Sequence, residues 1–409
     1  MKQTLITNIG KLIGITDKPR LCGTEMSDLQ QMDNAFLLIE NGTIVSYGSM
    51  DTVPTCVHYT IDAKGGILMP SYCDSHTHIV YAGSRDQEFL DKLRGLSYEE
   101  IAKRGGGILN SAQRLHQTDE SQLYEQSAMR LQEVIRTGTG TIEIKSGYGL
   151  TLEDELKMLR VIRRLKENYP ALIKSTLLGA HAVPLEFKKR QDEYVTMVCE
   201  QMIPAAAHEG LADFIDVFCD EGFFTVADTD RILTAAAKYG MRPKIHANEL
   251  ANSGGVQIGI KHNALSVDHL ERAETPEVEA LLASNTMPTA LPGASFFLNI
   301  PYAPTRQMVN AGLSVALASD YNPGSSPCGD MRFVMTLACI YMRLLPEEAF
   351  NAVTINGAYA MDAHQQTGSI AIGKRANLIL TKPVPSLAFI PYAHHTPYIE
   401  KILLNGEVQ

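Results

Sequence analysis

The sequence predicts an α/β fold: a (β/α)8 TIM-type barrel with a small β-sandwich domain built from both chain ends. Strand-like apolar runs alternate with helical patterns through the centre, whereas both ends are rich in β signals. A chain of 409 residues suits a large barrel with an appended domain. We expect the small domain to comprise residues 1–66 and 366–409 and the barrel domain to comprise residues 67–365.

Apolar strand-like runs in the centre carry the barrel prediction. They end at Cys73, Lys145, Gly179, Cys219, His246, His269, Leu291 and Ser319. Helical patterns separate most of these runs, which favours a parallel barrel. In such a barrel the active site lies at the C-terminal ends of the strands.

Two of the intervening helices are predicted with defined ends. Residues 151–169 carry leucines at helical spacing, and Thr151 followed by Asp154 is a plausible capping start. Residues 225–238 form a second amphipathic pattern, which Gly240 closes.

The two chain ends read as β structure. The runs 36–40 and 43–47 flank Asn41-Gly42, a strong hairpin-turn dipeptide. Near the other end, 376–381 and 399–404 are strand-like. We therefore expect both ends to build one small domain.

Composition excludes several classes of protein. The formal charge is −10 and no Lys/Arg-rich run occurs, so we expect no nucleic-acid partner. The seven cysteines include no CxxC pair, which argues against a disulfide framework and a Cys-rich zinc site. We find no signal-peptide pattern and no stretch of about 18 apolar residues. The expectation is a cytoplasmic protein with no membrane partner.

Histidine and aspartate residues gather where the barrel would place its site. His76 and His78 are two apart on an extended segment and point the same way. His246 and Asp320 close two other strands. Three imidazoles and one carboxylate can hold a divalent transition metal, Zn²⁺ or Fe²⁺, with a further position open to water. The alternative is that His246 and Asp320 are capping or hydrogen-bonding residues.

Two further residues at strand ends could carry chemistry. Glu249 lies three residues after His246, and a carboxylate beside metal-activated water can act as a general base. His269 ends the next strand and could orient water or stabilise a developing oxyanion. The alternatives are a surface glutamate in a loop and a buried core histidine.

Several segments together resemble amidohydrolases, and among them the imidazolonepropionase family. These segments are 70–85, 143–149, 179–184, 246–249 and 319–325. The resemblance extends over nearly the whole chain and implies metal binding by His76, His78, His246 and Asp320. It also implies substrate contacts from Arg85, Tyr98, Tyr148, His181, Glu249, Asn322, Gly324 and Ser325.

The reaction that the resemblance implies is metal-dependent hydrolysis of the cyclic amide of 4-imidazolone-5-propanoate to N-formimidoyl-L-glutamate, in histidine degradation. The catalytic residues would be Glu249, His269 and Asp320, with Glu249 or Asp320 returning the proton to the leaving nitrogen. Arg85 can hold the propionate with a forked pair of hydrogen bonds, and Tyr98, Tyr148 and His181 can donate to the same carboxylate or to the ring. The resemblance also suggests a homodimer.

Two rival functions use the same scaffold. A deaminase of the superfamily, acting on a nucleobase-like ring, could use the same constellation, but a neutral ring needs no anion-binding set. A non-catalytic assembly subunit would typically lose metal ligands, and this chain retains them.

Lys145 raises the question of a second metal ion. Many two-metal amidohydrolases bridge their ions with a carbamylated lysine on strand four. By our count Lys145 ends strand two, while strand four, 214–218, is followed by Cys219, Asp220 and Glu221. We therefore expect one metal ion per chain and an electrostatic or structural role for Lys145.

Overall fold

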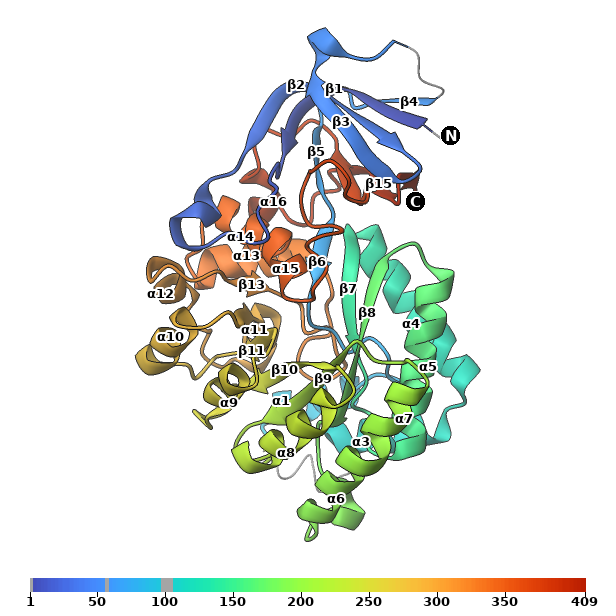
Figure 1. The fold of residues 1–409 in the computed structure, drawn as a ribbon, viewed down its shortest axis with the longest axis vertical. Coiled ribbons are helices and arrows are strands. Elements are labelled where there is room, and N and C mark those ends of the chain that lie inside the picture. The colour runs from blue at the N-terminus through green and yellow to red at the C-terminus, as the bar shows by residue number, and fades with distance from the viewer. Residues whose placement is uncertain (1–2, 56–58, 97–105) are drawn as a thin grey trace.

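The computed structural model describes residues 3–55, 59–96 and 106–409. Figure 1 shows two parts: a barrel of strands surrounded by helices, and a separate sheet at one end that contains strands from both ends of the chain. The predicted fold class is therefore confirmed.

Parallel strands form the barrel in the order in which they occur along the chain. Each neighbouring pair from β6 to β13 is parallel. Each apolar run singled out in the sequence contributes one strand. The strands are β6 (Tyr72–Asp74), β7 (Thr139–Lys145), β8 (Leu172–Ala180), β9 (Phe214–Cys219), β10 (Arg242–Ala247), β11 (Ser266–His269), β12 (Met287–Ala290) and β13 (Ala316–Leu317).

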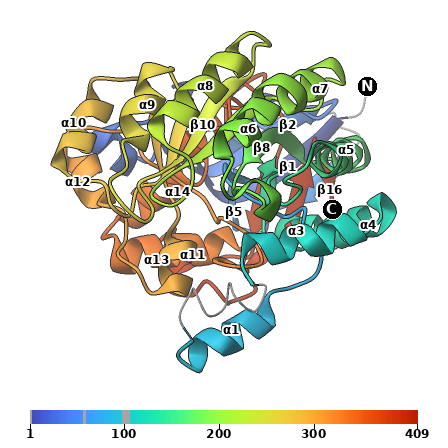
Figure 2. The same cartoon turned by 90° about the horizontal axis from the view of Figure 1, so that it is seen from below.

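Helices surround these strands (Figure 2). Among the described residues, none of the helices is long and apolar enough to cross a bilayer. The helices are α1 (Asp86–Leu93), α3 (Ile108–Gln117), α4 (Glu120–Arg136), α5 (Leu152–Asn168), α6 (Gln191–Met197), α7 (Ile203–His208), α8 (Val226–Ala237), α9 (Gly255–Lys261), α10 (Thr275–Leu282), α11 (Pro292–Leu298), α12 (Thr305–Asn310), α13 (Met331–Tyr341), α14 (Pro346–Ala352), α15 (Ile355–Tyr359) and α16 (Phe389–Tyr392).

The two helices predicted with defined ends are present. The Thr151 hydroxyl accepts a hydrogen bond from the Asp154 backbone N–H at the start of α5. Thr225 and Asp228 form a reciprocal capping box at the start of α8. Gly240, just past the end of α8, adopts a φ of +73°.

The barrel closes through chain segments that follow β6 and β13. The His78 backbone N–H donates to the carbonyl of Tyr321 (2.9 Å), and the Asp320 N–H donates to the carbonyl of His76 (3.0 Å). Thr77 and Tyr321 form a parallel bridge between the same segments. Closure therefore places the His-x-His segment beside Asp320.

The second sheet joins the two ends of the chain. Strand β5 pairs in parallel with β1 and antiparallel with β14, so strands from opposite ends share one sheet. One buried apolar cluster draws side chains from both ends, for example Ile6, Leu37, Leu378 and Leu403. The strands are β1 (Gln3–Ile13), β2 (Gln31–Glu40), β3 (Thr43–Ser49), β4 (Tyr59–Asp62), β5 (Ile67–Pro70), β14 (Leu378–Thr381), β15 (Ile399–Leu404) and β16 (Glu407–Val408).

The predicted hairpin turn links β2 and β3. Glu40 pairs with Thr43 across it, and Asn41 and Gly42 have φ values of +47° and +82°. Positive φ at both central residues matches the right-handed twist of the strands, which is why Asn-Gly is favoured there.

Candidate metal centre and active site

Four side chains predicted as metal ligands converge at the C-terminal end of the barrel. The Nε2 atom of His76 lies 3.1 Å from that of His246 and 3.3 Å from that of His78. The Oδ1 atom of Asp320 lies 3.6 Å from His76 Nε2 and 3.5 Å from His78 Nε2. All four residues are buried. Three imidazole nitrogens and a carboxylate oxygen that face one another form a donor set suited to a divalent transition metal.

Buried carboxylates orient two of these imidazoles from behind. His76 Nδ1 donates to Asp268 (2.6 Å), and His246 Nδ1 lies 2.9 Å from Asp216. A carboxylate at Nδ1 places the proton there and leaves Nε2 as a lone-pair donor for a metal. Burial lowers the pKa of His76 well below its usual value, which favours the neutral ring.

The sequence reasoning assigned no role to Asp216 or Asp268. Each is an acidic residue within a buried strand, and neither side chain is exposed. Burial would raise the pKa of Asp216, but His246 and Lys145 hold it well below its usual value. A charged residue inside an apolar strand was the signal that could have identified both.

Glu249 lies on the loop that follows β10. The Asp220 carboxylate accepts hydrogen bonds from the backbone N–H groups of Glu249 (2.8 Å), Leu250 (2.9 Å) and Ala251 (3.1 Å). These bonds fix the loop at the mouth of the barrel. Burial raises the pKa of the Glu249 carboxyl to about 7.

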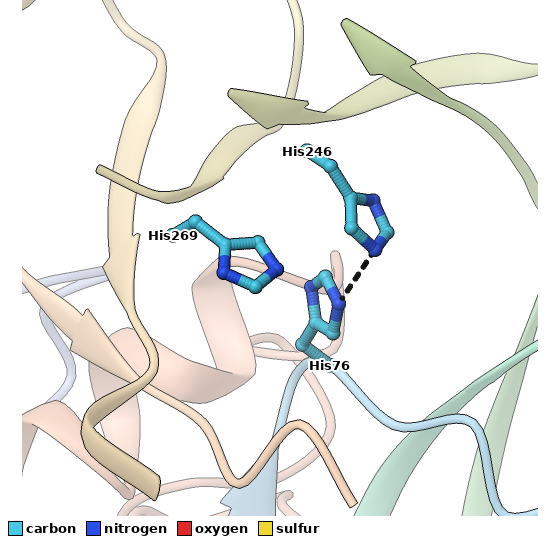
Figure 3. A group of neighbouring side chains, drawn as sticks. All are labelled: His76, His246 and His269. Carbon is cyan, nitrogen blue, oxygen red and sulfur yellow. Dashed lines mark hydrogen bonds between the residues drawn. The ribbon is translucent and has the colours of Figure 1, made fainter. Parts of the chain in front are cut away.

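His269 lies between two carboxylates at the end of β11. Its Nδ1 is 3.6 Å from Glu249 Oε2 and 3.5 Å from Glu271 Oε1. Burial would lower the pKa of His269, but these two carboxylates raise it well above its usual value. Figure 3 shows the rings of His76, His246 and His269 gathered around one space. Glu271 is a second neighbour that the sequence reasoning missed.

Two of the site residues, His269 and Asp320, have an unusual backbone conformation that determines the direction of their side chains. His269 has a φ of +84° and Asp320 a φ of +54°, both in the left-handed region. Such conformations cost a non-glycine residue about 1–3 kcal/mol and persist where the surrounding structure enforces them. Both residues lie at the point where the chain leaves a barrel strand, so the strain is concentrated at the site.

Arg85 approaches the site with part of its guanidinium already engaged. Its Nε and Nη2 atoms bond to the Glu88 carboxylate at 2.8 and 2.7 Å. A Cβ atom at position 324 would overlap the Nη1 atom of Arg85, so Gly324 allows the guanidinium to lie against the loop after β13. Nη1 is therefore the nitrogen of the guanidinium that does not contact Glu88, and it lies against Gly324.

Tyr148 and His181 lie beside the predicted ligand His78. The His181 ring stacks on that of His78 with centroids 5.3 Å apart, and the Tyr148 ring lies 5.4 Å from His181. His181 Nδ1 lies 2.9 Å from the Gly147 carbonyl, and burial lowers its pKa to about 3. A neutral ring that donates from Nδ1 has an accepting Nε2, so the geometry favours contact with a substrate N–H over donation to a carboxylate.

Polar groups of the loop after β13 form hydrogen bonds with one another. The Asn322 amide donates to the Asp320 carbonyl (2.7 Å) and accepts from the backbone N–H groups of Gly324 and Ser325. The Ser325 hydroxyl lies 3.2 Å from Asp320 Oδ2. These bonds hold the Asp320 side chain in place. Tyr98, the remaining predicted substrate contact, lies outside the described residues.

A comparison with family models identifies the class of protein. Residues 67–409 match the model of the amidohydrolase family. The match covers the barrel and the C-terminal strands of the second sheet. The chain therefore belongs to the amidohydrolase family.

Comparison with curated proteins narrows this assignment. The chain is 53% identical to the imidazolonepropionase of Christiangramia forsetii over 407 residues, which is 99% of each chain. It is 52% identical to the imidazolonepropionase of Flavobacterium johnsoniae over 408 residues, again 99% of each chain. Within the amidohydrolases, it belongs to the imidazolonepropionase family.

Solved structures share the fold at low sequence identity. Escherichia coli guanine deaminase superposes with a TM-score of 0.76 at 13% identity, covering 100% of this chain and 99% of the deaminase. A 5-methylcytosine deaminase from Klebsiella pneumoniae superposes with a TM-score of 0.74 at 14% identity, covering 97% of each chain. These similarities establish the barrel architecture alone.

Asp220 offers a test of how the loop carrying Glu249 is held. If Glu249 is the general base expected from the sequence, Asp220→Ala should lower kcat about 10²-fold, because a displacement of about 1 Å at such a group is worth that much. Metal content should stay at the wild-type level, since the four converging side chains are untouched. Steady-state kinetics and elemental analysis measure the two effects, and unchanged kcat would contradict the positioning role. Asp192→Ala, on an exposed carboxylate, is the control.

Proposed function

We propose that this chain hydrolyses the cyclic amide of 4-imidazolone-5-propanoate to N-formimidoyl-L-glutamate, a step in histidine degradation. The observation that carries the proposal is the convergence of His76, His78, His246 and Asp320 beside Glu249 and Arg85. The full-length similarity to imidazolonepropionases supports it. The two deaminases compared above share only the fold with this chain, and no described residue of the site favours a neutral nucleobase.

The four converging side chains would hold one divalent ion, Zn²⁺ or Fe²⁺. When bound, such an ion polarises a carbonyl and lowers the pKa of a water molecule toward neutrality. Lys145 does not enter this donor set, because its ammonium lies 2.6 Å from Glu143 and 2.8 Å from Asp216. Those contacts favour a charged lysine over a carbamylated one that would bridge two ions.

Glu249 and His269 would carry out the proton transfers. Glu249 takes a proton from the attacking water, and the resulting hydroxide adds to the ring carbonyl carbon. His269, held between Glu249 and Glu271, donates to the carbonyl oxygen as negative charge develops there. The ring C–N bond then breaks, and the proton that Glu249 took from water returns to the nitrogen, either directly from Glu249 or by transfer through Asp320.

The remaining site residues would bind the two ends of the substrate. Arg85, through the Nη1 group that does not contact Glu88, and the Tyr148 hydroxyl would bind the propionate carboxylate. The accepting Nε2 of His181 can meet a ring N–H. Asn322, Gly324 and Ser325 shape the wall beside Asp320. Tyr98 stays a proposed substrate contact on the strength of the family resemblance.

The direct test is to incubate the purified protein with 4-imidazolone-5-propanoate and with cytosine and guanine. We expect loss of imidazolone absorbance, formation of N-formimidoylglutamate by mass spectrometry, and no ammonia from the nucleobases. Release of ammonia from a nucleobase with an intact imidazolone would overturn the proposal in favour of a deaminase.

The metal centre predicts about one transition-metal ion per chain. The four side chains that would bind it supply enough donors for one ion, and Lys145 is engaged elsewhere. Elemental analysis of protein purified without chelator would measure the ratio of Zn and Fe to protein. A result of no metal, or of two ions per chain, would contradict the single-ion centre.

The proposed role of Arg85 predicts that substrate binding depends on the positive charge of its guanidinium. Arg85→Ala should lower kcat/KM by about 10-fold or more, because the bound carboxylate loses a charged hydrogen bond worth about 1.5–3 kcal/mol. Arg85→Lys should restore activity only in part, since an ammonium lacks the planar fork. Arg160→Ala, on a partly exposed arginine paired with Glu209, is the control. Unchanged kcat/KM in Arg85→Ala would show that another residue binds the propionate.

If Glu249 is the general base, replacing its carboxylate should remove the proton acceptor of the reaction. Glu249→Gln should lower kcat by about 10²–10⁴-fold while metal content stays the same. In the wild type, activity should fall as pH decreases, because protonating Glu249 removes the base. Burial places its pKa at about 7, and a bound cation favours the carboxylate, so the acidic limb should lie at or below pH 7.

Rates across pH and elemental analysis would check these effects. Near-normal kcat in Glu249→Gln would assign the proton to another group, His269 or Asp320. An inactive variant that also lacks metal would show that Glu249 is a ligand.

The proposal extends to a cytoplasmic homodimer. Large apolar side chains are exposed on and beside α13 and α16, including Ile340, Tyr341 and Tyr392, which a second copy could cover. Light scattering should then give about twice the chain mass of 44.9 kDa. A mass equal to one chain at micromolar concentration would contradict the dimer, and cell fractionation would test the location.

A further inference from the structure

A network of buried ionic side chains fills the barrel beneath the proposed ligands. Glu143, Lys145, Asp216, Lys244 and Asp268 come from four neighbouring or facing strands, and none of their side chains is exposed. Barrel interiors of this type are filled mainly by branched apolar residues. An ionic interior at this level is therefore a departure that needs a physical reason.

Lys145 joins two carboxylates on different strands. Its Nζ lies 2.6 Å from Glu143 on β7 and 2.8 Å from Asp216 on β9. Asp268 on β11 lies 3.9 Å away. The ammonium therefore fixes where the Asp216 carboxylate lies inside the barrel.

Lys244 closes the network from β10. Its Nζ bonds to Glu143 and to the carbonyls of Ser75 (2.7 Å) and Ala360 (3.2 Å), and it lies 3.6 Å from Asp268 Oδ2. Ser75 directly precedes His76, so this bond also restrains the backbone that carries a proposed ligand.

Each aspartate of the network contacts a proposed ligand. Asp216 accepts from the His246 backbone N–H (3.1 Å) and lies 2.9 Å from its Nδ1. Asp268 accepts from His76 Nδ1. The lysines thus contact the carboxylates, and the carboxylates contact the imidazoles whose Nε2 atoms converge.

Stability alone gives a poor reason for this network. Desolvating buried ions offsets most of their mutual attraction, and apolar residues of similar volume are often as stabilising. Placement of a functional group is a better reason, because carboxylates behind metal-binding histidines set ring orientation and tautomer.

We propose that Lys145 and Lys244 are positioning residues of the metal centre. Acting through Asp216 and Asp268, they hold His246 and His76 with their Nε2 atoms converged before an ion arrives. The inference rests on the proposed metal centre and adds to it the groups that preorganise the site.

The test measures Zn²⁺ affinity on metal-stripped full-length protein by competition with a chromophoric chelator. Lys145→Met and Lys244→Met should each weaken Zn²⁺ binding by about 10- to 100-fold, the range seen when the groups behind metal ligands are removed. Equal Kd values in folded variants and wild type would overturn the inference.

A matched control separates positioning from the general effect of losing a buried lysine. Lys374 is also buried, and its Nζ bonds to the Ser369 hydroxyl (2.7 Å) and the Thr367 carbonyl (3.3 Å). Lys374→Met should keep the wild-type Kd even if it lowers the melting temperature. A Kd raised as much by Lys374→Met as by Lys145→Met would show that the effect is not specific.

A double variant covers the case in which Lys145→Met fails to fold. Lys145→Met combined with Asp216→Asn removes both charges of one pair, which leaves no unpaired buried ion. If Lys145 acts through Asp216, the double variant should bind Zn²⁺ as weakly as Asp216→Asn alone. If the double variant bound Zn²⁺ more weakly than Asp216→Asn alone, the inference that Lys145 acts through Asp216 would be overturned. A wild type that takes up no Zn²⁺ would instead contradict the metal centre itself.

Discussion

Two backbone hydrogen bonds, from His78 to Tyr321 and from Asp320 to His76, connect the first barrel strand with the last. They pair segments that lie about 240 residues apart in the chain, at the point where β6 and β13 have already ended. The His-x-His pair and the aspartate meet because of this closure. The left-handed conformation of Asp320 follows from it as well, since its backbone N–H must reach the His76 carbonyl while its side chain turns toward the imidazoles.

Charge compensation continues from the converging side chains into the barrel. Imidazole nitrogens contact Asp216 and Asp268, and these carboxylates lie near Lys145 and Lys244. Each group gains a partner, which offsets the penalty of burying it. The converging side chains at the mouth are therefore backed by charged groups inside the barrel, while a separate apolar cluster joins residues of the strands, such as Ile144 and Val217, with residues of the helices, such as Leu159.

The sequence sufficed for the strand order because mainly apolar runs alternate with helical patterns along the chain, as expected of consecutive parallel strands. The caps at Thr151 and Thr225 are local signals, and so is the Asn41-Gly42 turn. Contacts that depend on strand register could not be read in this way, such as Lys145 with Asp216 across two strands.

Some contacts between site residues and their near neighbours were also not predicted. Arg85 and Glu88 lie three residues apart at the start of α1, so their pairing could have been expected from helical spacing. The position of Glu271 beside His269 could not have been expected, because His269 and Leu270 both adopt positive φ and redirect the chain after β11. His181 has an accepting Nε2 because its Nδ1 donates to the carbonyl of Gly147, which lies 34 residues away in the sequence.

The shared sheet has a consequence for biosynthesis. Strand β5 pairs with β1 early in the chain and with β14 near its end, and one apolar cluster needs side chains from both. A ribosome delivers residues 3–70 long before residues 378–404, so the apolar face of the first strands stays uncovered during most of translation. Exposed faces of this kind are prone to aggregate. We therefore expect a nascent chain truncated before β14 to require chaperone protection, even when its barrel strands are complete.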